Sequence, residues 1–388
     1  MKISLLSKSE LLCRAAVLPA FSLAVAGAFA AAPSWITTER SVTKVADGVY
    51  VIIHKDAVAG AWPQGNTTVV IGEQSVLVVD ACFLTDSARE DIADIRRLTP
   101  KPVRYLVNTH FHLDHNGGNS AYVDAFPDLQ IIAHESTRRL MNDSNRSAAA
   151  NLADPQGRPA TVLIPALKKQ LDSGLGSDGK PLSAADRAVL TQEIAETENE
   201  IANFRAFRFE PPTVTFDHEM SIDLGHREVR IEHLGRGNTP GDAFVYLPVE
   251  KVLATGDLLD SPVPYMRMSF PHEWVEVLRD MSHMDASVIV PGHGAVMHDG
   301  VYLNQVIALL DTVIRQVREQ VPNLRVNSKT KQIDVNDLHI DLSSFRSDMT
   351  GDDPDNVAFW EDIVDPGMIG GTNQGVVGRT FAEEIGRQ

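Results

Sequence analysis

Cysteine is nearly absent from this chain of 388 residues, which contains two. Cys13 lies in a segment that we expect to be removed on export, so Cys82 remains alone and no intramolecular disulfide can form. We expect Cys82, at the end of an apolar run, to be a buried core thiol. Positive charge is also scarce, because 35 Lys and Arg stand against 52 Asp and Glu, a formal net charge of −17. This acidity disfavours nucleic acids and anionic membranes as partners.

Residues 1–30 have the pattern of a secretory signal peptide. Three basic residues precede an apolar stretch from Ala15 to Ala28, and Ala28-Phe29-Ala30 is an A-x-A cleavage site. The apolar stretch is short for a bilayer span, although a retained membrane anchor is the alternative. We therefore expect a periplasmic or secreted protein with no membrane contact beyond this segment.

Short strands and helices alternate along most of the remaining chain, which favours an α/β fold class with layered packing. Runs of apolar and β-branched residues predict strands over 49–54, 67–71, 75–79, 103–107, 129–133, 213–216, 228–233, 243–247, 252–254 and 287–290. Apolar residues at helical spacing predict helices that begin at Thr85 or Asp86 and that cover 120–125 and 302–321.

The segment 135–210 differs from its surroundings. It has few β-branched residues and many Ala, Leu, Glu and Arg, so we interpret it as a helical insertion with a long helix from about Ser183 to Phe207. The sequence thus predicts one domain over 31–300 that contains this insertion, followed by a C-terminal helix and polar tail over 301–388. The tail after residue 322 gives little indication of its structure.

Three imidazoles and a carboxylate occur within six positions in His110-Phe111-His112-Leu113-Asp114-His115, just after an apolar run. In an extended chain His110 and His112 point to the same side, so both can bind one cation. The chain then turns at Asn116-Gly117-Gly118, which leaves Asp114 and His115 free to face a second cation, as in two-metal hydrolytic sites. The pattern indicates a metal centre rather than a histidine-rich surface turn.

Four candidates in one segment cannot complete two metal sites, so distant loops must supply more ligands. One such loop is the turn-rich stretch from Gly235 to Asp242. Asp257 follows a predicted strand in Thr255-Gly256-Asp257, and the carboxyl ends of strands are where α/β proteins place their ligand sites. His293 follows another strand, in Pro291-Gly292-His293.

The order of these motifs, H-x-H-x-D-H, T-P-G, T-G-D and P-G-H, resembles the metallo-β-lactamase fold superfamily from about Val42 to His298, with the helical insertion as an interruption. The resemblance implies a four-layer αββα sandwich with two metals, usually zinc, at one edge of the paired sheets. It also implies a role for each residue. His110 and His112 would bind the first metal, Asp114, His115 and His293 the second, Asp257 would bridge them, and Asp80 would support the ligands from behind.

One position departs from this family pattern. The family loop usually reads G-H-T-P-G-H, and its first His completes the first site, but this chain has Asn238 there and Asp242 at the later His. An amide oxygen is a harder and weaker donor than imidazole for zinc, so the first site should be weaker or suited to another metal such as Fe or Mn. Three readings stay open: Asn238 coordinates, water or Asp242 takes its place, or the enzyme holds one metal.

The chemistry expected of such a centre is hydrolysis. A divalent metal lowers the pKa of bound water toward neutrality, so it supplies a hydroxide without any Ser or Cys nucleophile, and Asp114 would orient that hydroxide as the catalytic carboxylate. We expect a small-molecule substrate that is a cyclic amide or ester, with a β-lactam as the leading candidate. The substrate-binding residues and the oligomeric state cannot be deduced.

Several alternatives remain for the activity. Lactonase, thioesterase, sulfatase and phosphodiesterase chemistry all use the same paired metals on this fold. From other classes, an iron-dependent oxidoreductase and an exported metal-binding protein without catalysis are also consistent with the sequence. We expect His272 to be structural or to lie on the surface, although His272 and Arg267 follow Asp257 closely enough that a substrate contact is the alternative.

Overall fold

The structure is a computed structural model, and it describes residues 40–54, 64–147, 157, 159–177, 179–266, 268–323, 338–361 and 376–386. The predicted signal peptide, residues 1–30, and Arg267 lie outside these ranges. Within the described part of the chain, the helices are all too short or too polar to span a bilayer.

The first sheet has seven strands in the order of the sequence. Neighbours among the first four strands run antiparallel, and from the fourth strand onward neighbours are parallel. Antiparallel strands need only tight turns, whereas the parallel ones are joined through helices. The strands are β1 Arg40–Ala46, β2 Val49–His54, β3 Thr67–Ile71, β4 Val76–Val79, β5 Val103–Val107, β6 Gln130–His134 and β7 Val214–Phe216.

The second sheet has five strands in the order β12-β11-β10-β9-β8. Only β11 and β12 run parallel in it, and their carboxyl ends carry Asp257 and His293. These two ligand candidates therefore come to the same edge of the sheet. The strands are β8 Glu219–Asp223, β9 Glu228–Glu232, β10 Phe244–Leu247, β11 Val252–Asp260 and β12 Val288–His293.

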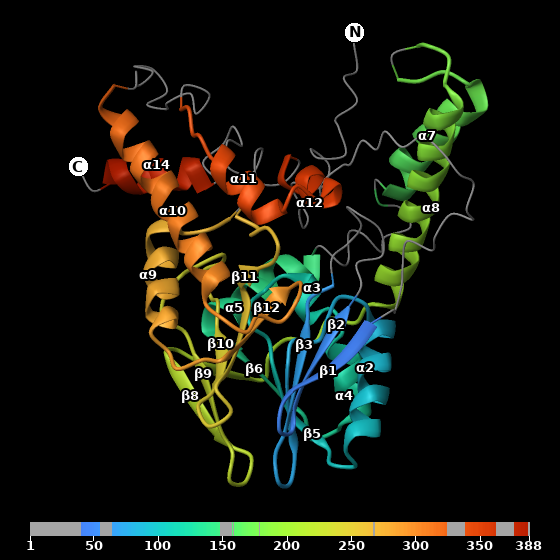
Figure 1. The fold of residues 1–388 in the computed structure, drawn as a ribbon. Helices are drawn as coiled ribbons and strands as arrows, with labels where there is room; N and C mark the ends of the chain where they lie inside the picture. Colours follow the sequence, from blue (N-terminus) through green and yellow to red (C-terminus); the bar gives the residue numbers. More distant parts are fainter. Residues whose placement is uncertain are drawn as a thin grey trace.

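The two sheets face each other, and helices cover both outer faces (Figure 1). Side chains such as Val79, Ile132 and Val245 form a buried cluster between the sheets. A second cluster joins the first sheet to α2 (Thr85–Leu98) and α4 (Asn119–Ala125), and a third joins the second sheet to α9 (Pro271–Ser282) and α10 (Val301–Gln320). This is the predicted four-layer αββα sandwich, which is confirmed.

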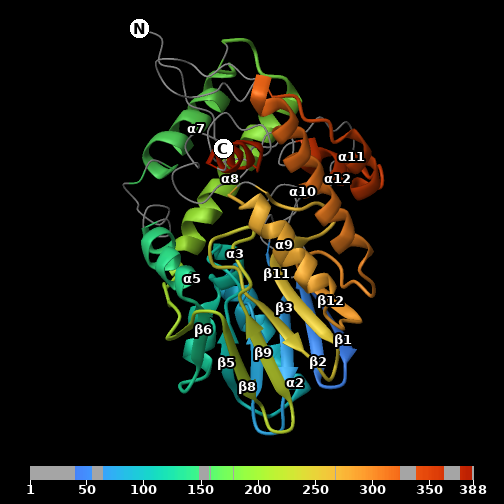
Figure 2. The ribbon, with the colours of Figure 1, turned by 90° about the vertical axis from the view of Figure 1, so that its left-hand side faces the viewer.

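Further helices lie beyond one end of the sandwich, the end that also carries α3 (Leu113–Asn116) (Figures 1 and 2). Within 135–210, α7 packs on α8 through Ile164, Leu167 and Ile194. From the C-terminal part, α14 packs on α9 and α10. These helices are α5 Glu135–Leu140, η1 Met141–Asn145, η2 Pro159–Leu163, α7 Ile164–Ser173, α8 Ala184–Ala206, η3 Val321–Asn323, α11 Ser343–Thr350, α12 Pro354–Phe359 and α14 Val376–Gly386.

The packing of α14 removes one predicted substrate contact. His272, near the start of α9, is buried with both ring nitrogens against the carboxylates of Glu383 and Glu384, the latter at 2.7 Å. Arg318 of α10 also donates to Glu384, at 2.8 Å. The structural interpretation of His272 therefore agrees with the structure, and the alternative of a substrate contact does not, because its ring anchors the C-terminal helix.

Candidate metal centre

The histidine motif does not continue the strand before it. β5 ends at Val107, His110 and His112 lie in a bend, and α3 carries Asp114 and His115. The expectation of an extended chain here is therefore wrong. The bend is held by Asp80, whose two carboxylate oxygens accept hydrogen bonds from the backbone N and the Oγ1 of Thr109, both at 2.8 Å.

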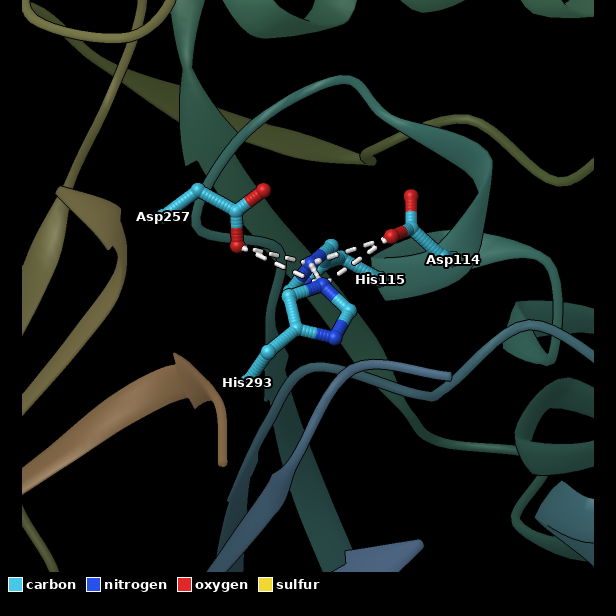
Figure 3. A group of neighbouring side chains, drawn as sticks. All are labelled: Asp114, His115, Asp257 and His293. Atoms are coloured by element: carbon cyan, nitrogen blue, oxygen red, sulfur yellow. Dashed lines mark hydrogen bonds and ion pairs between the residues drawn. The ribbon is translucent and has the colours of Figure 1, made fainter. Parts of the chain in front are cut away.

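Four ligand candidates converge at what we call the second site, Asp114, His115, Asp257 and His293 (Figure 3). The Nε2 atom of His293 lies 3.1 Å from Nε2 of His115 and 3.1 Å from Oδ2 of Asp114. Asp257 Oδ1 lies 2.9 Å from His115 Nε2. Residues from opposite halves of the sequence thus point donor atoms at one small volume, as predicted.

Three ligand candidates converge at the first site, His110, His112 and again Asp257. His110 Nε2 lies 2.9 Å from His112 Nδ1 and 3.1 Å from Asp257 Oδ2. One oxygen of Asp257 faces the first site and the other faces the second. This arrangement is the one expected of a bridging carboxylate.

The donor atoms fit divalent cations. Asp257 Oδ1 is buried and makes no hydrogen bond, although an imidazole nitrogen lies 2.9 Å away. A buried carboxylate oxygen without a hydrogen bond is unfavourable unless a cation compensates it. Imidazole nitrogens with carboxylate oxygens are the donor set that zinc and similar divalent metals take in proteins.

Hydrogen bonds behind the rings orient two of the imidazoles. Asp80 accepts from Nδ1 of His115 at 2.8 Å, so the lone pair of Nε2 faces the second site. Thr109 Oγ1 gives its hydrogen to Asp80, so it accepts from Nδ1 of His110 at 3.0 Å. The Nε2 lone pair of His110 then faces the first site. Such supporting bonds fix the ring orientation and the tautomer of metal-binding histidines.

The charges of the second site stabilise one another. Burial raises the pKa of Asp114, but the positive charges of His115 and His293 outweigh it and hold this pKa at about 2. Burial lowers the pKa of His293, and the carboxylates of Asp114 and Asp257 reverse the effect and raise it to about 9. Burial alone dominates at His110, whose pKa is lowered. A field that favours positive charge this strongly also favours a cation.

Asn238 is fully buried, and neither its amide oxygen nor its amide nitrogen has a hydrogen-bond partner among the described residues. Its loop lies beside the first site, because Ala243 N donates to Thr109 O at 2.8 Å and a Cβ on Gly237 would meet Leu258. Asp242 is differently engaged. Its oxygens accept from Thr239 Oγ1 at 2.8 Å, Thr239 N at 2.7 Å and Gly237 N at 3.1 Å. These bonds organise the loop and engage the carboxylate of Asp242, whereas the amide of Asn238 is unengaged among the described residues.

Asp260 is a buried carboxyl group that the sequence reasoning missed. It ends β11 and pairs in register with His293. Burial and the negative charge of Asp257 raise the pKa of Asp260 well above its usual range. The sequence could have indicated Asp260, because it is a carboxylate directly after the apolar residues Leu258 and Leu259.

Fold and site together define a protein of the αββα sandwich class with a paired-metal centre at one edge of its sheets. The family model of the metallo-β-lactamase superfamily matches residues 60–293, and the chain belongs to that superfamily. The resemblance deduced from the motifs is confirmed.

The curated relatives include two sulfatases. The chain is 24% identical over 258 residues to a linear primary-alkylsulfatase of Pseudomonas sp., covering 64% of this chain and 44% of that protein. It is 25% identical over 219 residues to the alkyl/aryl-sulfatase BDS1 of Saccharomyces cerevisiae, covering 54% of this chain and 29% of that protein. The chain therefore spans less than half the length of these relatives.

Solved structures share the fold at lower identity. The stereoselective inverting sec-alkylsulfatase Pisa1 from Pseudomonas sp. aligns with a TM-score of 0.51 at 15% identity, over 73% of this chain and 43% of that one. A metallo-β-lactamase from Pontibacter korlensis aligns with a TM-score of 0.50 at 18% identity, over 70% of this chain and 99% of that one. These likenesses concern the fold.

Proposed function

We propose that this chain is an exported metal-dependent hydrolase with two zinc-type sites that share Asp257. The observation that carries the proposal is the division of this carboxylate, with Oδ2 3.1 Å from His110 and Oδ1 2.9 Å from His115. The second site would use Asp114, His115 and His293. The first would use His110, His112 and the amide oxygen of Asn238.

Asn238 supports this assignment because its amide group is buried without a partner beside the first site. A buried unpaired amide is unfavourable by about 1–3 kcal/mol unless a ligand satisfies it. Oxygen ligands suit harder metals than zinc, so the first site would bind zinc less tightly than the second, and Mn or Fe is a reasonable occupant.

For the substrate we propose a sulfate ester. The curated relatives named above are sulfatases, whereas the β-lactam reading rests on a fold that many hydrolases share. Divalent metals supply a nucleophilic hydroxide at neutral pH and stabilise negative charge on the departing oxyanion. This chemistry serves a tetrahedral sulfur centre as well as a carbonyl.

The ligand residues differ in exposure, which indicates how substrate would reach the centre. His110, His115 and Asp257 are almost fully buried, while the side chains of His112, Asp114 and His293 are each 17% exposed. Substrate would therefore approach from the side of these three. Asp114 would orient the attacking water and accept its proton.

The test is a substrate panel with the purified full chain, measuring sulfate release from a primary alkyl sulfate by ion chromatography and β-lactam opening by absorbance. We expect metal-dependent sulfate release that a chelator abolishes and zinc or manganese restores. Asp114→Ala and His115→Ala should lose turnover while circular dichroism stays unchanged. β-Lactam opening without sulfate release would reject the sulfate-ester proposal, and near-normal activity in both variants would reject the metal centre as the catalyst.

A further inference from the structure

The second site is assembled from two distant parts of the chain. α3, which follows strand β5 of the first sheet, supplies Asp114 and His115, while β12 of the second sheet supplies His293, 178 residues after His115. The ligand atoms must keep separations of about 3 Å for one ion to contact them all. Something must therefore hold β12 in place relative to α3.

Gly65 and Asn66, which we call the clamp, contact both parts directly. Gly65 N donates to the carbonyl of Asp114 at 3.0 Å, on the α3 side. On the β12 side, Asn66 donates hydrogen bonds to residues that precede and follow His293 in the chain. Its backbone N donates to Gly292 O at 2.7 Å, and its side-chain Nδ2 donates to Pro291 O at 3.0 Å and to Gly294 O at 2.9 Å.

The clamp and the loop that it holds fit the ligands closely. A Cβ on Gly65 would lie 2.5 Å from the ring of His115, and a Cβ on Gly292 would lie 2.1 Å from Oδ1 of Asp257. Only glycine allows backbone to approach ligands this closely. A shift of β12 would therefore change the distances from His293 to its partner ligands.

The clamp is itself fixed from behind. His54 in β2 is buried, with Nδ1 2.9 Å from Gly65 O and Nε2 3.0 Å from Oδ1 of Asp91. Asp91 in α2 also lies 3.6 Å from the guanidinium of Arg40. His54, Asp91 and Cys82 are close enough to one another to hold an ion, but the nearby Arg40 charge makes a cation unfavourable there. This buried group acts as structural support.

We propose that Asn66 is a positioning residue of the second metal site. Its two side-chain donors hold the carbonyls on either side of His293, and this sets the reach of His293 toward Asp114 and His115. The proposal rests on the proposed function, because it requires that this site binds a metal. Among the described residues, the hydrogen bonds that Asn66 donates go to the loop around His293 and none goes to His110 or His112, so its loss should affect the two sites unequally.

The experiment is a zinc titration of the full chain after chelation, followed by calorimetry, in the wild type, Asn66→Ala and Asn66→Asp. Asn66→Asp keeps the shape but replaces the two N–H donors by an acceptor that faces carbonyls. His293→Ala identifies the binding class that belongs to the second site. We expect both Asn66 variants to weaken the zinc affinity of that class by at least about tenfold, because substitutions of residues that support metal ligands have effects of this size. The zinc affinity of the other class should fall by less than about twofold.

Gln316→Ala is the matched control. Gln316 also joins two segments through its amide, since Nε2 donates to Asp341 O and Oε1 accepts from Asp341 N, both at 2.8 Å, but it lies on α10. It should leave both classes unchanged. If Asn66→Ala does not fold, Asn66→Ser, which keeps one hydroxyl donor, replaces it and should give an intermediate loss.

Two results overturn the proposal in distinguishable ways. A wild-type chain that binds two metals, with Asn66 variants that bind them equally well or lose both classes to the same extent, overturns the positioning role alone. A wild-type chain that binds no metal overturns the proposed function and the clamp's role with it.

Discussion

The two halves of the metal centre share a carboxylate and differ in everything else. The second site has two imidazoles, Asp114 and its oxygen of Asp257, all within 4.8 Å of one another. The first has two imidazoles and the other oxygen of Asp257. We propose that the amide of Asn238, buried without a hydrogen-bond partner among the described residues, stands there in place of a usual histidine. The second site therefore carries one more negative charge and no substituted ligand.

From this difference we expect one loop residue, Asn238, to set the relative metal affinities of the two sites. One imidazole of each site is oriented from Asp80, directly for His115 and through Thr109 for His110. This shared support does not distinguish the two sites, so we expect the ligands themselves to be the main source of the difference in metal affinity. We expect zinc to fill the second site before the first.

The largest effect on both sites is expected from Asp257→Ala. Because each of its oxygens faces one site, its loss should remove both binding classes and lower turnover by more than about 10³-fold. Metal content by elemental analysis and initial rates check this. Retention of one full equivalent of metal would mean that Asp257 serves a single site.

A pair of ligand deletions separates the two sites. His293→Ala should weaken the tighter class, and His112→Ala the weaker class, each by more than about 100-fold, since losing a ligand exceeds the effect of losing its support. Stepwise zinc titration followed by calorimetry gives the measurement. If each variant weakened both classes equally, the sites would act as one unit.

Substitution of the residues that hydrogen-bond to the ligand imidazoles should lower metal affinity less, and more selectively. Thr109→Val removes the acceptor for His110 Nδ1 with little change of shape, so it should weaken the first class by about 10-fold and spare the second. Asp80→Asn should weaken both by about 10- to 100-fold, because Asp80 Oδ2 accepts from Thr109 and from His115. The contrary outcome is a Thr109→Val chain that loses the second class.

The smallest effect should come from Asn238→His, which restores the usual family ligand. Imidazole binds zinc better than an amide oxygen does, so the first class should tighten by about tenfold and approach the second. Asn238→Ala, in which the donor is absent, should weaken zinc binding by the first class. Equal zinc affinity in all three chains would mean that residue 238 does not coordinate.

Most of the fold could be predicted because its strands are buried runs with clear turns between them. β3 and β4 were predicted from apolar and β-branched residues alone, and both are buried. β1 and β8 were missed. β1 is mostly exposed and β8 alternates around a single buried residue, so neither has the apolar content that marks a strand.

The site residues could be predicted from their chemistry, but their geometry could not. His110 and His112 do bring their nitrogens together, yet through a bend held by Asp80 rather than through an extended strand. Asn66 and Asp260 were not found at all. A hydrogen bond from Asn66 to Pro291 spans 225 residues, and no local pattern encodes such a contact.

The measurement that tests the central claim most directly is a zinc titration of the wild-type full chain after complete chelation. The account predicts two equivalents of zinc in two classes of distinct affinity, with only the tighter class lost in His293→Ala. A single equivalent, no bound zinc, or two classes of equal affinity would contradict it.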